Sequence, residues 1–418
     1  MSFDLVCVGF GVTALSLAIT LHERGALDNT LFLESQPASK WNPCSSSAGG
    51  RMRTSFLNDL ITSENPRSRF TFLKYLHATN RLALYANSSQ IQPSREMFAD
   101  YLRWCSASFQ NNVNFGKRVT AIFPVREDQQ PVRSWNVVFS DSVTGQQDSV
   151  TTKQVICAAG LQPFIPAPLS SIMDTSPDVV HATDCLQRIS STMRTTGGKC
   201  HFAIIGDGQT AADVFDHIHG IRGDHQVTWF TQDPVLRGTD DSPFIMDNTR
   251  KPSSKVGQAL PLELRRRAIG DGLCTDSVSA IDRHLLMSIY EVQYAQSVKE
   301  SDANKWKFQV KFQHKLVGAE KVANGKVRLS FQRPEFEEQL FGCNIFDLVI
   351  AATGYERTEY KKILAPLLGM LDGHQVTVNR DYQVNFRTGS CGVGCGLWLQ
   401  GALEGEDVSF RSFNLLAC

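Results

Sequence analysis

The sequence predicts an α/β protein with two dinucleotide-binding domains of the Rossmann type. Two glycine-rich segments, Gly9–Ala14 and Gly206–Ala211, each follow an apolar run typical of a strand and open a pattern typical of a helix. Two further strand-like runs, residues 154–160 and 347–355, end in small residues. The chain has 418 residues, which at roughly 150 residues per domain suits two or three domains.

Composition and charge exclude several classes of protein. Lys+Arg and Asp+Glu both number 42, so the formal net charge is zero, whereas nucleic-acid binders and polybasic membrane-surface proteins need excess positive charge. No apolar run approaches the ~20 residues that span a bilayer, and the N-terminus shows no secretion signal. The cysteines are then expected as free thiols in a reducing compartment. We expect a cytoplasmic protein with no metal site, no nucleic-acid partner and no membrane contact.

The first glycine-rich segment belongs to a strand–helix–strand unit. Gly9 permits a tight turn, Gly11 lets the backbone approach a pyrophosphate, and Ala14 is small enough for close packing of helix on strand. Glu34 ends the second strand and can accept hydrogen bonds from ribose hydroxyls. Because an acid at this position disfavours a 2′-phosphate, the segment predicts FAD or NAD, not NADP.

The second segment repeats the pattern, with expected cofactor contacts at Gly206, Gly208, Gln209 and Ala211. The strand after its helix, residues 226–230, ends in Thr231 and Gln232, and Arg237 follows shortly after. A missing acid with an arginine nearby is what a 2′-phosphate requires, so this site predicts NADPH. The alternative is that Arg237 is an ordinary solvated arginine.

Between residues 41 and 105 the sequence becomes specific to one family. The segments Met52–Leu60, Asn65–Leu76, Pro93–Trp104 and Asp240–Phe244 resemble MQxSFLKDL, DPRSxFTFLNYL, PxRxEFxDYxxW and DDSPF. These are segments of the ornithine/lysine N-hydroxylases, the flavin-dependent N-hydroxylating monooxygenases of siderophore pathways. The resemblance covers nearly the whole chain.

The domain organisation follows from the two glycine-rich segments and from the run at 347–355. That run ends in Ala-Thr-Gly-Tyr, which is frequent in flavin monooxygenases, and is expected to return the chain to the first domain. We expect an FAD-binding domain built from residues 1–164 and 341–418, with an NADPH-binding domain, 165–340, inserted in it. A small helical substrate region is expected at about 245–300.

The resemblance implies a reaction and further site residues. NADPH and FAD would act with O2 to N-hydroxylate a primary amine through a C4a-hydroperoxyflavin, in siderophore or other secondary-metabolite biosynthesis. The enzyme would be a homodimer or homotetramer. Further cofactor contacts are expected at Trp41, Arg95, Thr353 and Gly354, and catalytic positions at Arg53 and Asn58.

Positions that would face the substrate depart from the family. Asn58 stands where the family has a Lys proposed to grip the amino-acid carboxylate, and Arg53 replaces a Gln beside the flavin. Met246, Asp276 and Phe410 replace an Asn, an Asn and a Ser. A buried carboxylate without its cation costs about 3–5 kcal/mol, so the sequence predicts an amine other than free ornithine or lysine. Two alternatives are ornithine or lysine held differently, and an NADPH oxidase or flavin-binding scaffold that does not hydroxylate.

Overall fold

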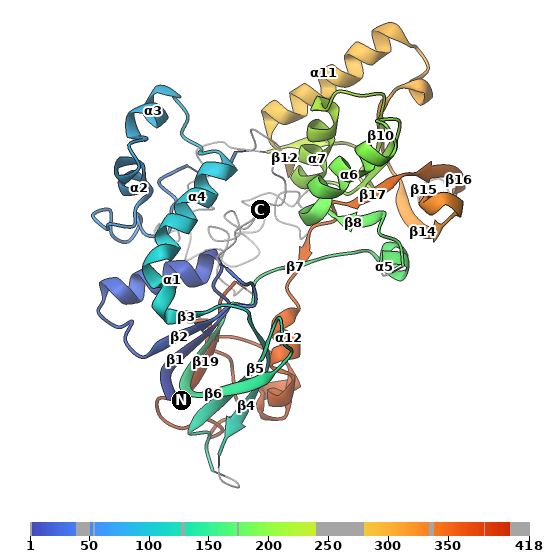
Figure 1. The fold of residues 1–418 in the computed structure, drawn as a ribbon. Helices are drawn as coiled ribbons and strands as arrows, with labels where there is room; N and C mark the ends of the chain where they lie inside the picture. Colours follow the sequence, from blue (N-terminus) through green and yellow to red (C-terminus); the bar gives the residue numbers. More distant parts are fainter. Residues whose placement is uncertain are drawn as a thin grey trace, which may run out of the picture.

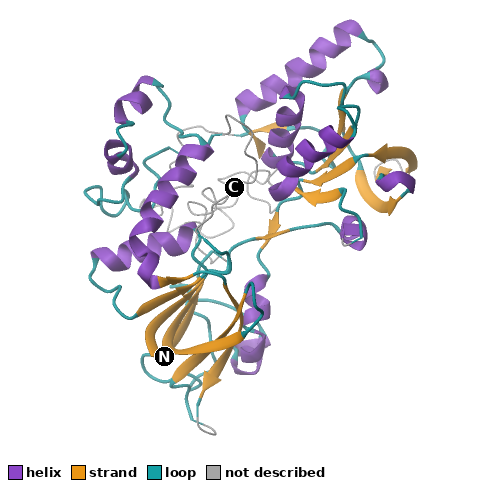
Figure 2. Ribbon diagram, in the orientation of Figure 1, coloured by secondary structure: helices purple, strands orange, loops and turns teal. Residues whose placement is uncertain are grey.

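The computed structural model describes residues 2–38, 51–52, 55–126, 130–173, 175–239, 280–333, 338–379 and 381–401. These residues form two α/β units, each with its own sheet (Figures 1 and 2). Each unit contains a sheet flanked by helices, as the sequence predicts; the sheet of the first unit combines parallel and antiparallel pairs, and that of the second is parallel.

The first unit contains a seven-stranded sheet in the order β3-β2-β1-β6-β5-β4, with β19 also paired to β6. Its strands are β1 (Ser2–Val8), β2 (Thr30–Leu33), β3 (Val113–Asn114), β4 (Lys117–Val125), β5 (Ser134–Asp141), β6 (Gln147–Cys157) and β19 (Gly396–Leu399). The helix α1 (Val12–Glu23) connects β1 to β2, which pair in parallel. This is the predicted strand–helix–strand unit.

Aromatic side chains hold three further helices against one face of this sheet: α2 (Phe72–Ala78), α3 (Leu82–Asn87) and α4 (Arg95–Ser106). Thr71 and Ser94 cap α2 and α4, because their hydroxyls accept hydrogen bonds from the N–H groups of Lys74 and Met97. The ring centroid of Phe72 lies between 5.2 and 6.4 Å from those of five other aromatic side chains: Phe56, Tyr75, Tyr85, Phe98 and Tyr101. On the opposite face, α12 (Glu359–Ile363) packs over β4 and β5.

The second unit contains a five-stranded parallel sheet in the order β13-β10-β9-β17-β8. Its strands are β8 (Val179–His181), β9 (His201–Ile205), β10 (Gln226–Phe230), β13 (Phe308–Lys311) and β17 (Leu348–Ala351). One face is covered by α6 (Cys185–Thr195), α7 (Gln209–Gly220) and α11 (Arg283–Lys299). The other carries α5 (Ala167–Met173) and an antiparallel sheet of β14 (Lys315–Lys321), β15 (Val327–Arg333) and β16 (Glu338–Phe346).

Two strand segments join the units: β7 (Gln162–Pro163) leads out of the first and β18 (Tyr355–Glu356) leads back, and they pair antiparallel (Figure 1). The chain returns to the first unit later in the sequence than expected. Strand β17 pairs with β9 and β8, so residues 348–351 belong to the second sheet, where an apolar strand can be buried on both faces. We propose a boundary near residue 355 in place of 341.

The expected helical substrate region is described only in part. Strand β12 (Ala280–Ile281) pairs with β11 (Arg237–Gly238), and α11 follows it. Helix α11 packs against the second sheet through Ile289, while Gln293 and Gln296 donate hydrogen bonds to the carbonyl of Phe308. The helix is thus part of the second unit, and residues 240–279 lie outside the described structure.

Candidate functional site: two glycine-rich loops and their strand ends

The first glycine-rich loop is shaped by a close approach of two strand ends. Gly9 has φ +92°, and a Cβ there would overlap the carbonyl oxygen of Ala158 at the end of β6, so only glycine fits. Gly11 caps α1, and a Cβ built on it meets nothing within 4 Å. Ala14 is fully buried. The loop therefore leaves an open cradle at the N-terminus of α1, where backbone N–H groups favour a phosphate.

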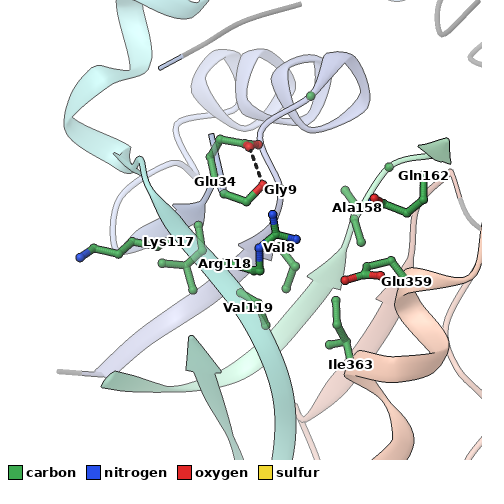
Figure 3. Close-up of a pocket in the computed structure, with 15 residues that line it drawn as sticks. Val8, Gly9, Glu34, Lys117, Arg118, Val119, Ala158, Gln162, Glu359 and Ile363 are labelled. Atoms are coloured by element: carbon green, nitrogen blue, oxygen red, sulfur yellow. Dashed lines mark hydrogen bonds between the residues drawn. The ribbon is translucent and has the colours of Figure 1, made fainter. Parts of the chain in front are cut away.

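The acid at the end of β2 lies beside this cradle. One carboxylate oxygen of Glu34 accepts a hydrogen bond from the N–H of Phe10 at 2.7 Å, and the other accepts from the N–H of Gln36 at 2.8 Å. Figure 3 shows Glu34 next to Gly9 at the rim of the pocket. A carboxylate has about four acceptor sites, so Glu34 retains capacity for ribose hydroxyls.

The pocket above the loop includes residues that the sequence patterns did not identify. Its wall is completed by the end of β6, the start of β4 and α12 (Figure 3), with side chains of Lys117, Arg118, Gln162, Glu359 and Ile363. Lys117 is bound to Asp141 at 2.8 Å. No local motif marks these residues: β4 reaches the pocket through its pairing with β5 and that of β5 with β6, and Glu359 and Ile363 come from α12, far along the chain. The open cradle, the acid and the helix terminus together fit the adenosine diphosphate part of FAD.

The second loop repeats this geometry. Gly206 has φ +150°, and a Cβ there would overlap the carbonyl oxygen of Ala352 at the end of β17. Gly208 caps α7, and Ala211 is fully buried. Gln209 donates to Asp213 at 2.9 Å and accepts from the N–H of Asp282 at 2.6 Å, so it links α7 to the start of α11. The N-terminus of α7, which has no side-chain cap, fits the pyrophosphate of a second dinucleotide.

The end of β10 is not free of acids, contrary to the sequence pattern. Asp207, inside the loop, accepts hydrogen bonds from the hydroxyl of Thr231 at 2.6 Å and from the N–H of Gln232 at 2.8 Å. Arg237 lies at the start of β11 with its guanidinium 3.0 Å from the carboxylate of Asp233. The expected cation for a 2′-phosphate is therefore beside the strand end, half exposed, and already paired.

Arg95 joins the two units. Its guanidinium lies 3.3 Å from the carboxylate of Asp213 in α7, and both side chains are only 5% exposed. Its Nε donates to the carbonyl of Arg51 at 3.4 Å. The residue expected as a cofactor contact thus forms a buried ion pair between α4 and α7.

Thr353 and Gly354 lie between β17 and β18, where the chain returns to the first unit. The hydroxyl of Thr353 donates to the carbonyl of Phe164 at 2.5 Å, and the N–H of Phe164 donates to the carbonyl of Gly354 at 3.0 Å. His181 Nε2 lies 3.1 Å from that same carbonyl oxygen. Both residues thus stabilise the pair of segments that connects the two units.

Asn58 is half-buried in a turn that Asp59 stabilises. The carboxylate of Asp59 accepts hydrogen bonds from the N–H groups of Ile61, Thr62 and Phe72 at 2.6–3.0 Å. These hydrogen bonds, two within the turn and one to the start of α2, fix the backbone next to Asn58. The other expected positions, Trp41, Arg53, Met246, Asp276 and Phe410, lie outside the described residues.

The sequence matches the family described as L-lysine 6-monooxygenase/L-ornithine 5-monooxygenase over residues 1–357. The chain belongs to this family. It is 31% identical to the L-ornithine N(5)-monooxygenase of Ajellomyces capsulatus, over 96% of this chain and 85% of that protein.

Two solved structures are similar throughout. The ornithine hydroxylase PvdA from Pseudomonas aeruginosa has a TM-score of 0.83 at 26% identity, covering 100% of this chain and 99% of that one. The ornithine N-hydroxylase KtzI from Kutzneria sp. 744, solved with reduced FAD, NADP+ and L-ornithine, has a TM-score of 0.84 at 26% identity, covering 100% and 98%.

Membership of the family confirms several predictions. The protein is an oxidoreductase of the flavin-dependent amine N-monooxygenases, with FAD and NADPH as cofactors and paired Rossmann-like units. Among the helices of the described ranges, none combines the length and the apolar character that crossing a membrane requires.

Proposed function

We propose that this enzyme hydroxylates the terminal nitrogen of a small amine that does not offer an α-carboxylate to Asn58. The observation that carries the proposal is the neutral Asn58, half-buried in the turn fixed by Asp59, where the family resemblance places a Lys. An amide donates one or two hydrogen bonds but cannot neutralise a carboxylate. In a water-excluded site the unmatched charge would oppose binding of a free amino acid.

The chain's residues would divide the work as follows. Glu34 and the N-terminus of α1 would hold FAD, and Gly208 at the N-terminus of α7 would admit the pyrophosphate of NADPH. Bound FAD, once reduced by NADPH, would supply the activated oxygen. Asn58 would orient the polar end of the substrate so that its neutral amine faces that oxygen, and the closed site would exclude water.

Ornithine is the second candidate. Relatives named as L-ornithine N(5)-monooxygenases, and the L-ornithine bound in KtzI, favour it. A polar partner other than the residue at position 58 would then have to hold the carboxylate. Either reading places the product, a hydroxylamine, in siderophore or other secondary-metabolite biosynthesis.

An amine panel tests this proposal. Ornithine, lysine and the diamines that lack their carboxylates are compared for NADPH oxidation, peroxide and hydroxylamine. We expect coupled hydroxylation with a carboxylate-free amine and mostly peroxide with ornithine. Asn58→Lys should lower the KM for ornithine about tenfold or more, since a charge-assisted hydrogen bond contributes about 1.5–3 kcal/mol. Asn58→Gln, which stays neutral, is the matched control.

Two outcomes would contradict the proposal. Tight coupling of the unmodified enzyme to N5-hydroxyornithine would support ornithine held in another way. Peroxide as the main product with every amine, also after Asn58→Lys, would indicate an NADPH oxidase.

We also propose a cytoplasmic homo-oligomer. Met287, Tyr290, Tyr294 and Val298 lie on one face of α11 and are 56–71% exposed, and their spacing forms one continuous apolar stripe. Light scattering on the purified enzyme measures the mass. A monomer at micromolar concentration would contradict this proposal.

A further inference from the structure

We propose that Asp207 is a coenzyme-specificity residue: its carboxylate supplies the strand-end acid that the second site otherwise lacks, which weakens selection for the 2′-phosphate and lets NADH reduce the flavin beside NADPH. This rests on the proposed function of the second loop as the nicotinamide dinucleotide site.

The contacts of Asp207 place its charge at the end of β10. Thr231 is the first residue after β10, and its hydroxyl donates to Asp207 Oδ1 at 2.6 Å. The N–H of Gln232 donates to the same oxygen at 2.8 Å. Within the described part of the chain Oδ2 makes no hydrogen bond, so one carboxylate oxygen remains to accept from a ribose hydroxyl.

The first loop shows what such an acid does. There the acid comes from the strand, because Glu34 follows β2 and accepts from the N–H of Phe10 in the loop. In the second unit the acid comes from the loop instead. Asp207 occupies the loop position of Phe10, and its carboxylate accepts from the N–H of Gln232 after the strand. Both loops thus hold a carboxylate at the place where the adenosine ribose lies in a Rossmann unit. An acid there accepts from the 2′-hydroxyl and repels a 2′-phosphate.

The charged side chains beside the end of β10 also disfavour selection of a 2′-phosphate. Arg237 is 3.0 Å from Asp233 and 49% exposed, so its charge is offset before a coenzyme binds. With Asp207, these three side chains sum to one negative charge. A 2′-phosphate must therefore share Arg237 with Asp233 and approach Asp207, whereas a ribose hydroxyl meets an acceptor.

The test uses the FAD-loaded enzyme and variants that separate charge from hydrogen bonding. Asp207→Asn keeps an oxygen that can accept from Thr231 and Gln232 but removes the charge, and Asp207→Ala removes both. Asp216→Asn, the control, makes the same charge change within α7. Flavin reduction by NADPH and by NADH is followed without oxygen, and binding of 2′,5′-ADP and 5′-AMP is measured by calorimetry.

We expect the unmodified enzyme to accept NADH, and Asp207→Asn to raise the NADPH-to-NADH ratio of kcat/KM about tenfold or more. The affinity for 2′,5′-ADP should rise relative to 5′-AMP in both Asp207 variants and stay unchanged in Asp216→Asn. Arg237→Ala should move the ratio in the opposite direction.

A ratio that Asp207→Asn leaves unchanged would overturn the inference. So would an unmodified enzyme that prefers NADPH over NADH by about a thousandfold or more, a discrimination of ~4 kcal/mol. Failure of both coenzymes to reduce the flavin would instead contradict the proposed function. The two nucleotide fragments would still report on Asp207 in that case.

Discussion

Breaking the buried ion pair between Arg95 and Asp213 should destabilise the protein more than any exposed pair would. The two groups are 3.3 Å apart with side chains 5% exposed. Asp213→Asn keeps an acceptor for the Gln209 amide, which lies 2.9 Å away, but removes the negative charge that faces the buried Arg95 guanidinium. Removing one partner of such a pair costs about 3–5 kcal/mol. Urea unfolding of the FAD-loaded enzyme, followed by circular dichroism, measures this loss.

A double-mutant cycle decides whether the loss comes from the pair. Arg95→Met keeps the apolar stem and removes the charge, so Arg95→Met with Asp213→Asn should cost at least about 1 kcal/mol less than the sum of the single changes. Arg328→Met, at the exposed pair with Glu320, is the control and should cost at most about 1 kcal/mol. Additivity within about 0.5 kcal/mol would refute the reasoning, because the two side chains would then not stabilise each other.

Two further predictions concern the first loop and the second sheet. Gly11→Val should fold but purify colourless, because its side chain enters the open cradle. Gly9→Val, which collides with the Ala158 carbonyl, should instead lower the melting temperature. A yellow Gly11→Val enzyme with full flavin occupancy would contradict the assignment. Burial lowers the pKa of His201 from 6.5 to about 4, so between these values the unfolded chain binds the extra proton and stability falls as the pH falls. His201→Gln should flatten the dependence of unfolding free energy on pH by up to about 1.4 kcal/mol per pH unit, and an unchanged slope between pH 4 and 6.5 would show that His201 does not cause it.

Local patterns predicted much of the fold and part of the site. The loop glycines, Ala14 and Ala211 are required by backbone geometry and close packing within one strand–helix unit, and their spacing shows this without any tertiary information. Glu34 was predicted by the same rule, since it ends the strand of that unit. The strand at 347–355 was also identified, but its sheet was not, because an apolar run does not state which strands it will pair with.

Sequence alone determined the family, the two dinucleotide-binding units and the departure at Asn58, because each of these is written in short contiguous segments. Only the tertiary structure decided the partners of charged side chains. Asp207 reaches Thr231, Arg95 reaches Asp213, and Arg237 meets Asp233. The physical reason is that a charge acts over a few ångströms of space. Residues 95 and 213 come within that distance only after two separate sheets have formed and their helices have met.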